Sequence, residues 1–176
     1  PLAGSAFKKV YYDELLGRAV SKFVQADDLI VPYTATSLAD AEAVIHVIKM
    51  SENDLRKKQV VGFYRDIEVK PGYDQETEVE KKERQLEGIK KTRDEDVFTI
   101  LECHVNLDIE GFEDVGQDGE PTGIKLPYIV TIEEGSRQVL SIRRNYKPED
   151  PLKNKIQYFV HFRFLPGMGF YGFGLI

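Results

Sequence analysis

The residues best suited to chemistry are an adjacent cysteine and histidine, Cys103 and His104, within a strongly alternating segment. A nucleophilic thiol needs such a neighbour, because the imidazole accepts its proton. Neighbouring residues of a β-strand point to opposite faces of a sheet, however, so these two side chains cannot share a proton. The pattern favours a structural cysteine that points into the core, with His104 directed away from it.

The remaining metal-binding and acidic side chains form no recognisable site. His46, His104 and His161 stand far apart, without the short spacings of zinc ligands. The segment 108–120 holds six carboxylates but lacks the residue order of a calcium-binding loop. The sequence therefore predicts no metal ion and no cofactor, and it leaves open whether the acidic loop 108–120 binds calcium.

One glycine motif could bind a nucleotide, because Gly167 to Gly172 satisfy the spacing G-x-G-x-x-G. A dinucleotide site also needs a helix at the turn, a second parallel strand and an acidic residue about 20 positions later. Only four residues follow this turn, and Pro166 and two aromatic residues crowd it. We interpret the glycines as a bend that lets Phe170, Tyr171 and Phe173 pack. A small-ligand or nucleotide-binding enzyme domain using the turn at 167–172 is the alternative hypothesis.

The elements that position these residues are mainly strands. Alternating or β-branched runs, separated by hairpin-length loops, predict an antiparallel sheet. The predicted strands are 7–12, 18–24, 28–31, 43–50, 97–109, 128–133, 139–144 and 156–164. In the strand 97–109 the odd positions form the mostly apolar face, and Gly135 is available for a primed turn between 128–133 and 139–144.

Two helices complete the expected α+β fold. Ser51 with Asp54 three residues later resembles a capping box, and Gly62 ends this short helix. Residues 76–95 hold 13 charges and three apolar residues, which is typical of a solvated helix. We expect residues 71–96 to form an appended, long charged surface helix with its linkers.

Length and composition indicate an ordinary globular domain. The 176 residues, 41% of them hydrophobic, suffice for one domain over residues 1–176 with a core of its own. The net charge of −6 argues against a surface that wraps nucleic acid. The absence of a long apolar run predicts no membrane span. The uncapped apolar ending at 173–176 favours a piece excised from a larger chain.

Five segments in order resemble the portal protein of short-tailed double-stranded DNA phages and prophages. They are 7–12, 28–33, 46–51, 62–66 and the closing segment 158–175, which carries the strongest resemblance. The resemblance covers nearly the whole chain. It implies that these residues belong to the wing, the outward-facing region of a dodecameric ring at one capsid vertex.

The resemblance also implies a function without catalysis. The family's ring docks terminase, passes DNA through its tunnel during packaging and ejection, and holds the tail or its adaptor proteins. Its partners are other portal subunits and the capsid, and its location is the virion, with assembly in the host cytoplasm. The stem, clip and crown helices of the family are expected outside this chain. We therefore expect no strong DNA binding by this segment.

The resemblance and the apolar ending together predict candidate interface residues. They are Phe170, Tyr171, Phe173 and Arg163. The three aromatic side chains are expected to be partly exposed, with their natural cover supplied by residues beyond the chain. The wing alone, with its net charge of −6, is expected to be a monomer in dilute solution.

Overall fold

The computed structural model describes residues 4–13, 16–69, 82, 97–116, 118–167 and 169–174. Within this described part the chain forms eight strands and one short helix, α1. The predicted α+β class, dominated by antiparallel sheet, is confirmed in this coarse form. The predicted charged helix of 71–96 lies, apart from Lys82, outside the described residues.

The chain divides into two compact units. Unit 1 contains Pro1–Val47, Glu102–Val130 and Ile142–Ile176, and unit 2 contains Ile48–Leu101 and Thr131–Ser141. Four strands, β4 to β7, contribute residues to both units. The prediction of one domain over residues 1–176 stays a prediction.

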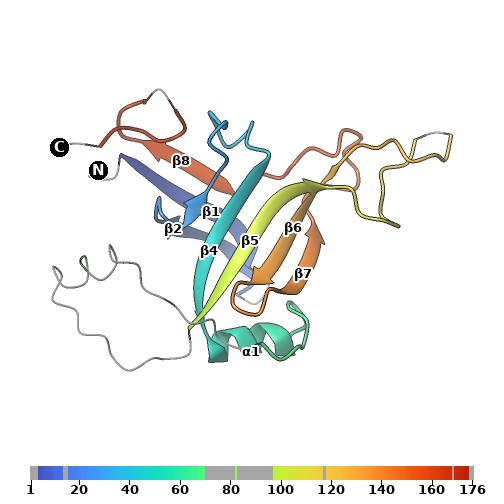
Figure 1. The fold of residues 1–176 in the computed structure, drawn as a ribbon, viewed down its shortest axis with the longest axis horizontal. Helices are drawn as coiled ribbons and strands as arrows, with labels where there is room; N and C mark the ends of the chain where they lie inside the picture. Colours follow the sequence, from blue (N-terminus) through green and yellow to red (C-terminus); the bar gives the residue numbers. More distant parts are fainter. Residues whose placement is uncertain are drawn as a thin grey trace. The chain divides into compact units, whose positions relative to one another are not determined.

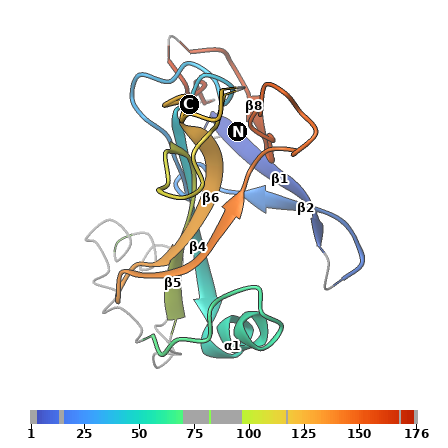
Figure 2. The same ribbon diagram turned by 90° about the vertical axis from the view of Figure 1, so that its right-hand side faces the viewer.

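A three-stranded antiparallel sheet lies in unit 1, with the order β2-β1-β8. Its strands are β1 (Ser5–Asp13), β2 (Arg18–Val24) and β8 (Phe159–Arg163), which lie side by side in Figures 1 and 2. The predicted hairpin of the first two strands is confirmed, with Phe7 opposite Val24 and Asp13 opposite Arg18. Gly17 supplies the left-handed conformation, φ 61°, that such a tight loop needs.

The second sheet has five strands in the order β3-β4-β5-β6-β7. They are β3 (Leu29–Ile30), β4 (Ala43–Ser51), β5 (Val97–Leu107), β6 (Leu126–Glu133) and β7 (Gln138–Arg144). All five correspond to predicted strands with shifted ends. The turn between β6 and β7 differs from the expectation, because Arg137 and not Gly135 adopts the positive φ. The Glu133 carboxylate stabilises this turn by accepting hydrogen bonds from the backbone N–H of Gly135 and Ser136.

Each unit has its own core. In unit 1 the core contains Phe7, Val24, Leu29, Ala35, Leu38, Ala41, Val44, Phe159 and Phe170. In unit 2 it contains Met50, Leu55, Tyr64, Phe98, Ile100 and Leu140. Leu55 reaches this second core from α1 (Glu52–Val60), whose predicted cap is confirmed because Ser51 Oγ accepts from Asp54 N at 3.2 Å.

The predicted orientation of β5 is wrong. Phe98, Ile100, Glu102 and His104 are buried, whereas Cys103 on the opposite face is only partly buried. Two of the even positions supply large apolar groups to the unit 2 core, and the two polar ones are paired in unit 1. The prediction took the more apolar face of β5 to be the buried one. The other face is buried although it includes two polar side chains, because these are paired and their burial then costs little.

Candidate functional site

The glycine turn at the end of the chain folds back onto the start of β1. Phe173 N donates to Leu165 O at 2.9 Å, and Gly172 N donates to Ser5 Oγ at 2.8 Å. A Cβ on Gly172 would lie 2.7 Å from the carbonyl oxygens of Gly4 and Leu165, too close for any side chain. The glycine at this position therefore permits a contact between backbones, in agreement with its interpretation as a bend.

Of the three aromatic residues expected to be exposed there, Phe170 is an exception. Its side chain is 5% exposed and stacks on His161 and Phe7, with ring centroids 4.8 Å and 5.9 Å away. The expectation of a partly exposed Phe170 is wrong because β1 itself supplies the cover. Phe170 therefore orders the turn from inside and offers no surface to a partner.

The other candidate interface residues reach the surface. Tyr171 is 44% exposed while its hydroxyl donates to Leu29 O at 3.1 Å, and Phe173 is 60% exposed. The exposed guanidinium of Arg163 donates to Thr36 O at 3.4 Å. The structure thus brings three of the four residues to the surface of unit 1.

A larger apolar surface lies on the three-stranded sheet. On the face directed away from Phe7, five large apolar side chains are between 45% and 66% exposed. They are Val10, Tyr12, Phe23, Val160 and Phe162, and we call them, together with Lys8, the outer sheet face. Lys8 lies opposite both Phe23 and Val160, and its ammonium is 5.9 Å from the ring centre of Phe162. Sequence reasoning missed this face, because alternation shows two faces of a strand without showing which one is covered.

The inner face of the same sheet contains a buried charged network. Lys9 Nζ and His104 Nε2 approach the same oxygen, Glu102 Oε1, at 2.6 Å and 2.7 Å. Burial alone would raise the pKa of Glu102, but the hydrogen bond from His104 and the charge of Lys9 hold it well below its usual range. Glu102 is therefore an ionised acceptor with two partners on one oxygen, an arrangement that ties β1 to β5 and suits structure better than proton transfer.

Two further titratable groups lie near this network. Burial, followed by the positive charge of Lys9, lowers the pKa of His46 to about 4. Burial, followed by the negative charge of Glu102, raises the pKa of the Cys103 thiol. A thiol with a raised pKa is a poor nucleophile, and Cys103 and His104 lie on opposite faces of β5. The arrangement therefore offers no activated cysteine.

The acidic segment after β5 is a small ordered arm. Within its described residues, Val115 pairs with Pro121, Gly116 N donates to Glu120 O, and Thr122 N donates to Asp114 O. Asp114 pairs with Lys153 and accepts from Thr122 Oγ1, interactions that lower the pKa of its carboxyl. Within the described part of the chain, no group of three or more histidine, cysteine, aspartate or glutamate side chains is placed to hold a metal ion.

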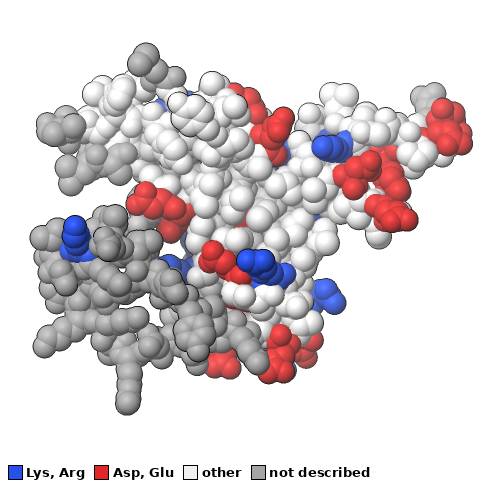
Figure 3. All heavy atoms as spheres, viewed as in Figure 1, with Lys and Arg blue, Asp and Glu red and all other residues white. Residues whose placement is uncertain are grey.

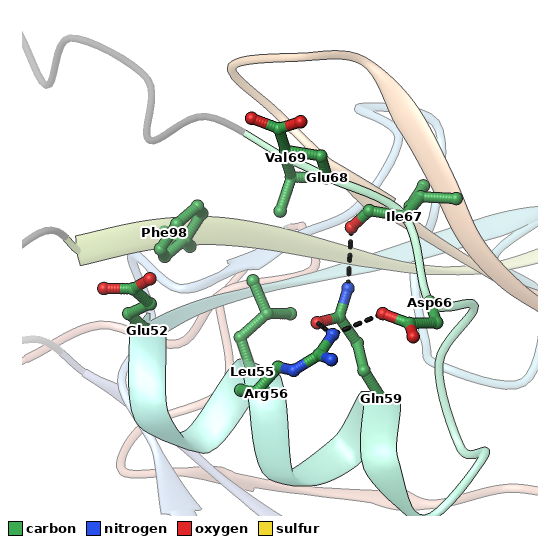
Figure 4. Close-up of a pocket in the computed structure, with 9 residues that line it drawn as sticks. All are labelled: Glu52, Leu55, Arg56, Gln59, Asp66, Ile67, Glu68, Val69 and Phe98. Atoms are coloured by element: carbon green, nitrogen blue, oxygen red, sulfur yellow. Dashed lines mark hydrogen bonds and ion pairs between the residues drawn. The ribbon is translucent and has the colours of Figure 1, made fainter.

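Unit 2 contains a pocket of about 270 Å³ beside α1. Figure 4 shows Leu55 and Phe98 at this pocket, with a hydrogen bond from Gln59 Nε2 to Ile67 O of 2.8 Å across one side. Arg56, which also lines it, pairs with Asp66. The Arg56 guanidinium is thus neutralised by Asp66, and the rest of the lining mixes apolar side chains with the carboxylates of Glu52 and Glu68.

Comparisons with known proteins identify no relative. No protein-family model matches the sequence, and a search of the curated proteins finds no significant match. The helix that the structure describes is not long and apolar enough to cross a membrane.

Proposed function

We propose that this chain is a structural part of the portal vertex of a short-tailed double-stranded DNA phage or prophage. In this proposal it forms part of the wing of a dodecameric ring through which DNA is packaged and ejected. The proposal starts from the resemblance of five ordered sequence segments to portal proteins.

The observation that carries the proposal is the exposed apolar surface of unit 1. The outer sheet face presents five large apolar side chains, and Tyr171 and Phe173 add two more near the end of the chain. Monomeric proteins rarely leave extended apolar patches in water, and such patches mark surfaces that another protein covers. A subunit of a large assembly buries such a surface against a neighbouring protein.

The polar groups of unit 1 support a role without catalysis. Glu102, a buried carboxylate, is paired with Lys9 and His104. Cys103 lies on the other face of β5 from His104 and has a raised pKa. The pairing of Glu102 supports a structural role for this network, and the proposed function includes no enzymatic activity and no cofactor.

The partners follow from the proposed role. They are other portal subunits, the capsid, terminase and the tail or adaptor proteins, and the location is the virion after assembly in the host cytoplasm. DNA passes through the ring without strong binding to this segment. Tyr171, Phe173 and Arg163 are proposed interface residues. Phe170 is buried, and its proposed role is to hold the glycine turn in place.

The alternative, a small-ligand or nucleotide-binding enzyme domain, gains no specific support. It requires backbone N–H groups of the glycine turn that are free to meet a phosphate. Gly172 N donates instead to Ser5 Oγ, and Gly172 packs against the backbone of Gly4. These contacts favour the structural interpretation of the turn.

Electron microscopy and mass photometry of the complete gene product that carries these residues test the proposal. A closed dodecameric ring, with this segment on its outer rim, is the expected result. A monomeric gene product, or a gene product with nucleotide-dependent activity, would contradict it. A variant with Tyr12→Ser and Phe162→Ser changes two exposed side chains and should lower the yield of rings without unfolding the subunit.

A further inference from the structure

Two exposed surfaces of unit 1 carry opposite charges, and both expose large apolar side chains. The first is the outer sheet face, whose described residues carry one charge, that of Lys8. The second is the acidic arm, which we define as residues 110–116 and 118–124. The two surfaces are different parts of the same unit, and Figure 1 shows the arm extending away from β1, β2 and β8.

The acidic arm combines carboxylates with exposed apolar groups. It carries five acidic residues and no basic one, and Figure 3 shows acidic side chains gathered on this extension. One of the five, Asp114, is paired with Lys153 outside the arm, which leaves four to meet a partner. Three large apolar side chains on it, Phe112, Val115 and Ile124, are each more than half exposed. Apolar groups exposed on an ordered arm indicate a segment that inserts into another surface, and its charge requires a surface that is not acidic.

The outer sheet face meets both requirements. It supplies apolar area from three strands, and the Lys8 ammonium lies among these side chains beside the Phe162 ring. Although the chain has a net charge of −6, an acidic partner on this face meets a cation, and the face as defined contains no carboxylate. An acidic, partly apolar partner is therefore favoured there.

We propose that the occupant of the outer sheet face is the acidic arm of a second copy of this chain. Each copy then offers one arm and one face, so the contact is heterologous. Contacts of this kind run head to tail and close into a ring when the rotation between copies permits it. The inference rests on the proposed function for the association of copies, and adds the two surfaces that meet.

One arm on one sheet face buries a small area, so the isolated contact is weak and salt-sensitive. It is therefore compatible with a monomer in dilute solution. The experiment uses the chain at about 1 mM, where millimolar dissociation constants become measurable. The ionic strength is about 0.15 M, at which the repulsion between copies of net charge −6 is screened beyond about 8 Å, whereas a close contact between Lys8 and a carboxylate is screened less.

The test compares two variants and their mixture by sedimentation velocity. The face variant carries Lys8→Glu and Phe23→Ser, and the arm variant carries Phe112→Ser and Glu120→Lys. All four side chains are exposed, so both variants should fold as the parent does, which circular dichroism checks. Tyr33→Ser with Lys147→Glu, also exposed and outside both surfaces, is the control and should associate like the parent chain.

We expect each variant alone to associate at least about 10-fold more weakly than the parent chain, since each loses one side of the contact. The mixture should form a heterodimer that does not grow, because the intact arm of the face variant meets the intact face of the arm variant. If the arm variant still self-associates, two sheet faces pack on each other and the proposal is wrong. A parent chain or a mixture that stays monomeric also overturns it. A dodecameric gene product without this heterodimer would refute the inference alone and leave the proposed function standing.

Discussion

Lys9 of β1 and Glu102 of β5 form a largely buried ion pair of 2.6 Å, and the two residues stand 93 positions apart in the sequence. The pair joins the three-stranded sheet to the five-stranded sheet within unit 1. His104 adds a hydrogen bond to the same carboxylate oxygen. The fold of unit 1 therefore depends on a charge that is buried together with its partners.

Glu102→Gln should destabilise the protein strongly. The substitution leaves Lys9 buried without its counter-charge, a change that costs about 3–5 kcal/mol in the free energy of unfolding. Urea unfolding at pH 7 measures it, and Glu68→Gln, an exposed carboxylate, is the control with an effect within about 0.5 kcal/mol. Equal effects of the two substitutions would show that the ion pair does not stabilise the fold.

Mild acid should destabilise the protein through His46. Its pKa is about 4 in the folded state and about 6.5 when unfolded, so between these values only the unfolded chain binds the proton. The free energy of unfolding therefore keeps its full value above about pH 6.5 and falls as the pH is lowered towards 4. After allowance for the partial exposure of His46, the decrease should be about 2 kcal/mol.

Urea unfolding at several pH values between these limits checks this expectation. His46→Leu removes the titrating group, so the loss of stability between pH 6.5 and 4 should be smaller than in the parent chain. An unchanged pH dependence would assign the proton uptake to other groups.

Phe170→Ala and Phe173→Ala should differ sharply. Phe170 is buried among Phe7 and His161, and its truncation leaves a cavity that costs about 3–5 kcal/mol. Phe173 is mostly exposed, so its truncation should cost less than about 1 kcal/mol. Thermal and urea unfolding of the two variants measure the loss in the free energy of unfolding. Similar losses for both variants would show that Phe170 is not packed in the core of unit 1 as described.

Nucleotides should not bind to this chain. Gly172 N, one backbone donor of the glycine turn, already donates to Ser5 Oγ of β1, and Gly172 packs against the backbone of Gly4, so this part of the turn does not meet a phosphate. Isothermal titration calorimetry with NAD and with ATP should show no heat of binding. A micromolar dissociation constant for either compound would support the enzyme alternative.

The chain should be a monomer in dilute solution. Copies of net charge −6 repel one another, and this repulsion opposes association. Light scattering over a range of concentrations at moderate salt measures the mass. A stable dodecamer of these 176 residues would show that this segment by itself carries the ring-forming interface.

The sequence by itself determined the elements whose causes are local. Gly17 permits the turn of the β1–β2 hairpin, and Ser51 caps α1 by accepting from Asp54 N. Gly62, with φ 74°, ends that helix. Each of these features depends on residues within a few positions of one another, so pattern and turn chemistry sufficed to predict it.

Only the tertiary structure decided which faces are covered. The orientation of β5 could not be predicted because the partner that permits Glu102 to be buried, Lys9, comes from a distant strand. Phe170 is buried for the same reason, since Phe7 from the beginning of the chain covers it. The outer sheet face remains exposed because its strands pack on the core through their other side. Alternation along a strand separates two faces, whereas the choice between them depends on long-range packing that no short window of sequence contains.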